Sequence, residues 1–296
     1  MAIAGGLTMI LADSFSLNLV SDFRTMWQFA FMRHAFEAGT VVAIVAGVVG
    51  YFVVLRRSSF AAHALSHVGF AGAAGAVLVG LNPLVGLLVF TGGGGLAMAA
   101  LGRKAASRDV QIGTVLAFML GLGVLFISMY KGYATEAYSL LFGEILGIST
   151  GDVIFTAIAG LVILAATAIV YRPLLFASLD EDVAEAKGVP VLALGAIFML
   201  LVAVTTAIAV QVVGVLLIFA LLVTPPAIAE RLSRRPAAAV GISVAVALLV
   251  TWFGLFVSYY APYPVSFFIT SAVFAIYLAV RAAHAFRGRT SGVAGD

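Results

Sequence analysis

Two histidines, His63 and His67, stand in the sequence from Ser58 to Gly102, which contains no Asp, Glu, Lys or Arg. Four residues make about one helical turn, so a helix places both imidazoles on one face. Neutral imidazole is the commonest metal ligand in proteins, and two of them supply half of the coordination shell of zinc, manganese or iron. The zinc-protease motif has the same spacing but needs a glutamate where this chain has Ala64, which disfavours hydrolysis. The pair predicts a metal-binding site.

Other polar side chains are weaker candidates for a site on the same pathway. We expect Glu37, Glu144 and Asp152 near the outer ends of helices, where carboxylates attract cations. Ordinary solvated loop charge is the alternative for Glu144 and Asp152. Gln211 would line a pathway or form a hydrogen bond between helices.

The elements that position these residues must be helices in a lipid bilayer. The chain of 296 residues is 63% hydrophobic and 10% charged, whereas soluble domains carry about 25% charged residues. A spanning helix needs about 20 mostly apolar residues. We therefore predict an all-α integral membrane protein, a multi-span bundle of eight or nine transmembrane helices. The uncertain count comes from residues 188–229, where a turn at Thr205–Gln211 or a broken, re-entrant helix would fit.

Basic residues indicate how this bundle is oriented. In an alternating count of spans, one side holds 13 of the 16 Lys and Arg residues, and the positive-inside rule makes that side cytoplasmic. The C-terminus is then cytoplasmic as well. We expect an outer-face segment at 1–35, a transmembrane domain at 36–284 and a disordered cytoplasmic tail at 285–296. The four glycines Gly92–Gly95 predict an unwound or closely packed point within a span.

A short cytoplasmic segment near 178–190 carries most of the charge between two spans. Ser178 or Asp180 would cap a short helix, acidic residues fill its first turn, and Gly188 ends it before Pro190. Such a helix would serve either as a plain connection or as a docking element for a partner.

Three segments give the chain a resemblance to a known family. They are Arg56–Phe60 running into Ala64–His67, then Leu179–Val189, and then Val213–Ala229 with its Thr224-Pro225-Pro226. In this order and spacing, the chain resembles the permease subunit of ABC importers for zinc, manganese or iron, over roughly 37–281. This resemblance implies the fold of type II ABC importer permeases.

The same resemblance implies function and partners. The permease would pair with a second copy of itself, a cytoplasmic ATP-binding cassette ATPase dimer and an extracytoplasmic metal-binding protein. In the prokaryotic cell membrane it would pass a divalent metal by alternating access, with no permanently bound cofactor and no nucleic-acid partner. Four residues would form the ATPase-coupling surface, namely Asp180, Glu181, Ala184 and Gly188. The chain lacks a phosphate-binding loop of its own, so hydrolysis of ATP would belong to the partner and this chain would not be an enzyme.

One departure from the family and two alternatives remain open. The family commonly has aspartate at position 63, and a His–His pair in place of Asp–His would favour a softer ion such as zinc over manganese. A permease for an iron chelate, haem or a corrinoid would need a wider cavity and no paired imidazoles. A proton-coupled secondary carrier would move metal without any ATPase.

Overall fold

The described chain consists of helices. The computed structural model describes residues 19–100, 105–130, 147–261 and 263–292. Within these ranges, nine helices are long and apolar enough to cross a membrane, in agreement with the predicted eight or nine. The helices are α2 (Leu19–Gln28), α3 (Ala30–Leu55), α4 (Ser59–Leu78), α5 (Pro83–Ala100), α6 (Ala105–Met129), α8 (Thr150–Leu179), α9 (Glu181–Ala186), α10 (Val191–Val213), α11 (Val215–Leu232), α12 (Pro236–Tyr260) and α13 (Val265–Gly292).

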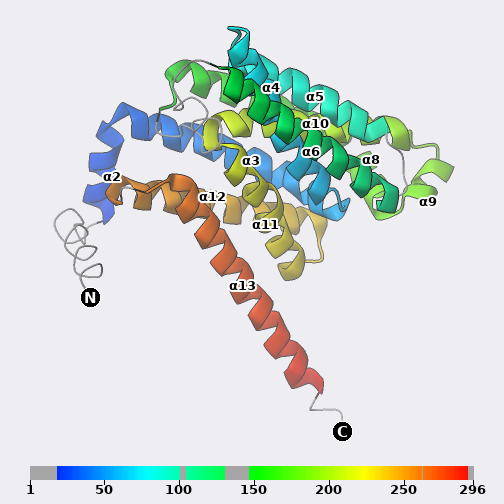
Figure 1. Cartoon of the computed structure of the whole chain (residues 1–296). Helices are drawn as coiled ribbons and strands as arrows, with labels where there is room; N and C mark the ends of the chain where they lie inside the picture. The colour runs from blue at the N-terminus through cyan, green and yellow to red at the C-terminus, as the bar shows by residue number, and fades with distance from the viewer. Residues whose placement is uncertain (1–18, 101–104, 131–146, 262, 293–296) are drawn as a thin grey trace.

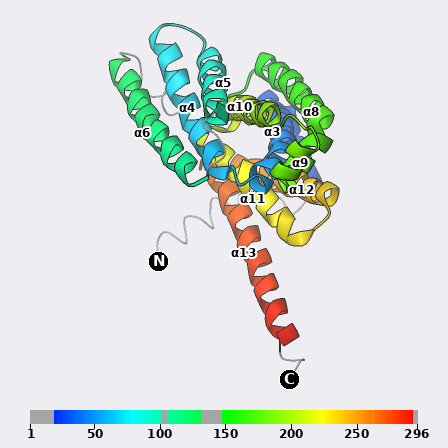
Figure 2. The same cartoon turned by 90° about the vertical axis from the view of Figure 1, so that its right-hand side faces the viewer.

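Helix α3 lies at the centre of the bundle. It contacts α8, α10, α11 and α12, while α4, α5 and α6 pack together beside it. The amphipathic α2 and the short α9 lie at opposite ends of the bundle (Figure 1). The C-terminal half of α13 projects away from the other helices in both views (Figure 2). Helix α4 is mostly buried and α6 is mostly exposed, so α4 belongs to the interior of the bundle and α6 to its surface.

Glycines allow the backbones of α4 and α5 to approach closely. Gly72 and Gly86 face each other, and a Cβ on either residue would meet the carbonyl oxygen of the other. Gly95 abuts the carbonyl oxygen of Met199 on α10. The run Gly92–Gly95 is helical throughout, so the close-packing expectation is confirmed and the unwound alternative is wrong. Neighbouring helices hold this stretch in place although glycine alone favours helix poorly.

The expected turn at Thr205–Gln211 is wrong. Helix α10 runs through these residues to Val213, with Thr205 and Thr206 buried inside the bundle. The break falls on Gly214, whose φ of 82° and ψ of 165° lie in a region open almost only to glycine. One residue therefore joins α10 to α11.

The ends of the transmembrane domain also differ from the sequence boundaries. Helix α3 begins at Ala30, so Glu37 lies two turns inside it. Helix α13 remains helical to Gly292, where a disordered tail from 285 was expected, since alanines around position 283 favour continuation of the helix. The side chains of Trp27, Phe29 and Phe31 are exposed at the α2–α3 junction, an arrangement that suits anchoring at a membrane interface.

Candidate functional site

The two histidines of α4 lie together inside the bundle. Their ring centroids are 4.7 Å apart and the rings meet edge to face at 86°. Both side chains are half-buried. The Nδ1 atom of each ring is buried and has no hydrogen-bond partner among the described residues. An unpartnered buried polar atom costs about 1–3 kcal/mol, which makes this pair a candidate for ligand binding.

An aromatic ring from another helix packs against His63. Phe219 lies on α11, and its ring centroid is 4.7 Å from that of His63. Gly214 ends α10 five residues before Phe219, and its backbone angles set the direction in which α11 starts. The side of α11 that faces α4 therefore depends on this residue. This contact could not be predicted from the sequence, since Phe219 is one apolar residue among many on an apolar helix.

The chemistry that this arrangement supports is the transient binding of a borderline metal ion. Two neutral imidazoles are good ligands for such an ion but complete only part of its shell. Within the described ranges, no group of three or more His, Cys, Asp or Glu side chains is placed to hold a metal. The remaining ligands would have to be water or groups from outside these ranges.

A second polar cluster joins the ends of three helices, α3, α8 and α10. Ser149 and Asp152 form a reciprocal capping box at the start of α8. Gln211 Nε2 on α10 donates a hydrogen bond of 2.9 Å to Asp152 Oδ1. On α3, the ring nitrogens of His34 contact the carbonyl oxygen of Ile148 at 3.0 Å and the hydroxyl of Thr150 at 3.3 Å. Asp152 and Gln211 are thus brought together, in an arrangement that fastens helices to one another.

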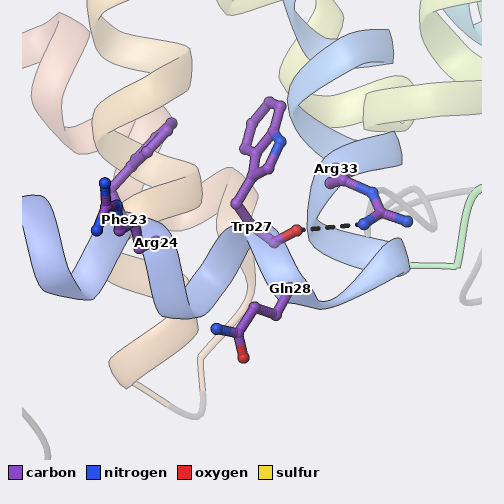
Figure 3. A pocket seen from close by; sticks show the side chains of 5 residues that line it. All are labelled: Phe23, Arg24, Trp27, Gln28 and Arg33. Atoms are coloured by element: carbon purple, nitrogen blue, oxygen red, sulfur yellow. Dashed lines mark hydrogen bonds between the residues drawn. The ribbon is translucent and has the colours of Figure 1, made fainter.

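The remaining acidic candidates are placed differently. Glu37 lines a groove of about 460 Å³ between α2, α3, α8 and α12, next to Trp27 and Trp252. Beside it, a hollow of about 390 Å³ is lined by Arg24 and its neighbours on α2 and by Arg33 on α3 (Figure 3). The positive charge there disfavours a mouth for cations. Glu144 lies outside the described residues.

The segment near 178–190 forms the predicted short helix. The carboxylate of Asp180 accepts a hydrogen bond of 3.0 Å from the Val183 amide, so Asp180, and not Ser178, caps α9. Gly188 follows with a φ of 82°. Ala184 is fully buried against Ala177 of α8 and against Val191 and Leu194 of α10.

This burial divides the candidate coupling residues into two groups. Ala184 holds α9 on this chain and is not free to contact a partner. Asp180 and Gly188 are exposed and Glu181 is partly exposed, and the apolar side chains of Leu179 and Val183 are 66% and 44% exposed. The outward surface of α9 thus combines acidic and apolar groups.

The comparisons with known proteins agree on one family. Residues 28–284 match the ABC 3 transport family. The chain is 31% identical over 235 residues to the manganese transport system membrane protein MntC of Listeria monocytogenes, covering 79% of this chain and 84% of that protein. It is 28% identical over 231 residues to the high-affinity zinc uptake system membrane protein ZnuB of Haemophilus influenzae, covering 78% of this chain and 88% of that protein.

The fold has a counterpart among solved structures. A chain of PsaBC from Streptococcus pneumoniae, solved in complex with Fab, superposes with a TM-score of 0.79. The two chains are 30% identical, and the match covers 88% of this chain and 95% of that one. The arrangement of the described helices is therefore one that this kind of protein adopts.

Proposed function

The chain belongs to the ABC 3 transport family, and from this premise we propose that it is the membrane-spanning permease subunit of an importer for divalent transition-metal ions. The candidates are zinc, manganese and ferrous iron. Relatives named for manganese and for zinc support this substrate class. The single observation that carries the proposal to this chain is the pair of unpartnered imidazoles at His63 and His67.

The two histidines would bind the ion for only part of the transport cycle. A transport site must bind well enough to admit the ion and weakly enough to release it. Two ligands from one chain, completed by water or by the second copy, suit that requirement better than a closed shell of four. The Phe219 ring over His63 would have to move aside for the ion to enter or leave.

Energy for the cycle would come from a cytoplasmic ATPase dimer. Helix α9 supports this role, because its buried Ala184 fixes it to α8 and α10 while its acidic and apolar residues face outward. Nucleotide binding by the partner would push or pull α9, and the bundle would open alternately to either side of the membrane. A second copy of the permease and an extracytoplasmic metal-binding protein would complete the proposed assembly. The distribution of basic residues favours a cytoplasmic C-terminus for this chain.

Reconstitution tests the proposal directly. The permease, its cognate ATPase and its metal-binding protein are placed in liposomes, and uptake of zinc, manganese and ferrous iron is measured with and without ATP. ATP-dependent uptake of at least one free ion is expected. Uptake driven by a proton gradient without the ATPase would identify a secondary carrier instead, and uptake of a metal chelate alone would identify a chelate permease.

A further inference from the structure

Arg56 joins the cytoplasmic ends of three helices. It caps the C-terminus of α3 and donates from Nη1 to Oγ of Ser178 on α8, with 3.4 Å between the two atoms. Its guanidinium carbon lies 5.3 Å from the centroid of the Phe198 ring on α10, a distance at which cation–π attraction operates. Arg56 therefore contacts both helices that flank α9.

The surroundings of Arg56 on the α9 side form one packed unit. Ser178 lies two residues before Asp180, the cap of α9, and its hydroxyl also bonds to the carbonyl oxygen of Leu174. Ala184 of α9 packs against the last turn of α8 and the first turns of α10. A displacement of α9 must carry these two helix ends with it, because packed interiors shift as blocks and do not deform continuously.

On its other side, Arg56 begins a tight turn into α4. The Ser58 amide donates to the carbonyl oxygen of Val53 at 2.8 Å, and the Ser58 hydroxyl donates to the Arg56 carbonyl oxygen at 3.2 Å. Arg57 between them has a φ of 52°, which L-residues rarely adopt. Ser58 then precedes the first residue of α4, and His63 follows one turn later. The turn has little freedom to absorb movement.

We infer that Arg56 is a positioning residue that transmits displacement of α9 to the His63–His67 pair on α4. This inference rests on the proposed function, since it takes α9 as the point where force enters and the histidines as the site of the ion. The path runs from α9 through the ends of α8 and α10 to Arg56, and from Arg56 through the turn at Arg57 into α4. Helix α10 also packs directly against α4, so Arg56 adds a polar link to that apolar contact.

The test is coupling efficiency in the reconstituted full transporter. The Arg56→Ala variant is expected to keep its rate of ATP hydrolysis within about twofold of wild type. The amount of metal moved per ATP falls about fivefold or more, because the variant loses one charged hydrogen bond and a cation–π contact. Arg56→Lys restores part of the coupling, because lysine keeps the charge but not the planar fork. Arg172→Ala, an exposed arginine on the same helix as Ser178, is the matched control and couples normally.

A distance measurement separates transmission from general damage. The chain has no cysteine, so spin labels attach only where cysteines are introduced. Ala186→Cys on α9 and Val79→Cys after α4 are each paired with Leu249→Cys on α12, and electron paramagnetic resonance gives both distances with and without nucleotide. Nucleotide changes both distances in an otherwise wild-type chain but only the α9 distance in Arg56→Ala.

Two results would overturn the inference. One is normal metal uptake per ATP in Arg56→Ala, and the other is movement of both labels in that variant. Failure of the proposed function looks different, since the wild-type complex itself would then show no uptake of free metal that depends on ATP.

Discussion

Gln211 on α10 donates a hydrogen bond to Asp152 at the first turn of α8, and the same carboxylate caps α8 through Ser149. One side chain thus serves both a helix terminus and a contact between helices. The two residues are 59 positions apart in the chain. Their pairing ties the start of α8 to α10 through the amide nitrogen of Gln211, whose Oε1 is buried without a hydrogen-bond partner among the described residues.

The first prediction compares the free energies of unfolding of two variants, one without the Gln211–Asp152 hydrogen bond and one that also lacks the Asp152 carboxylate at the start of α8. Gln211→Leu removes only the contact between helices and lowers the free energy of unfolding by about 0.6–1.7 kcal/mol. Asp152→Ala also removes the carboxylate half of the capping box but keeps the Ser149 cap, so its further loss is at the low end of capping effects, about 0.5 kcal/mol. Thermal unfolding in detergent measures both changes. Gln111→Leu, at an exposed glutamine on α6, is the control and leaves stability unchanged. A loss of metal uptake in Gln211→Leu with unchanged stability would return this residue to the pathway.

The second prediction concerns the loss of one imidazole. His67→Ala reduces ATP-dependent uptake of free metal by roughly 10–100-fold, since even outer-shell partners of metal ligands have effects of that size. His284→Ala, at an exposed histidine on α13, is the matched control and transports normally. Uptake assays on both variants in liposomes make the comparison. Unchanged uptake in His67→Ala would remove this residue from the site.

The third prediction addresses metal preference. His63→Asp replaces a neutral nitrogen ligand with a carboxylate, and oxygen ligands suit manganese better than imidazole does. Uptake of manganese relative to zinc therefore rises, measured as a ratio with both ions present together. His63→Asn, which supplies an uncharged oxygen at the same position, shows how much of the change depends on charge. An identical ratio in wild type and His63→Asp would contradict the role assigned to this position.

The fourth prediction concerns the junction of α10 and α11. Gly214→Ala forces a Cβ into a backbone conformation reserved for glycine, at a cost of about 1–3 kcal/mol. A decrease of several degrees in Tm is the expected result in detergent. Gly241→Ala on α12 is the control, because no atom lies within 4 Å of the added Cβ and alanine favours helix. An equal Tm for the two variants would show that the junction is not strained.

Much of the fold was predictable because the bilayer restricts the choices. Long apolar stretches can only be spanning helices in lipid, and backbone groups must be satisfied within each helix. The family resemblance carried by the segments at 56–67, 179–189 and 213–229 is confirmed by the family match. The cap at Asp180 was also predictable, since capping depends on a few neighbouring residues.

Contacts between helices were harder to predict. Thr205 and Thr206 resembled turn residues, but burial inside the bundle kept them helical and a single glycine made the break. The ring of Phe219 over His63 and the bridge from Arg56 to Ser178 depend on which faces of the helices meet. A soluble helix shows which face is buried by the spacing of its apolar and polar residues. A membrane helix that is apolar on all sides has no such pattern, so its buried face cannot be inferred from the sequence.

The single-residue junction at Gly214 also limits how α11 can rearrange. With no loop between α10 and α11, the only soft freedom at the junction is rotation about the two dihedrals of one glycine. Gln211, anchored to α8, lies three residues before this pivot and Phe219 lies five residues after it. A movement of α11 that takes the Phe219 ring away from His63 would therefore pivot at Gly214. Inserting one helical residue after Gly214 would turn the face of α11 by about 100° and present a different side chain to the histidines.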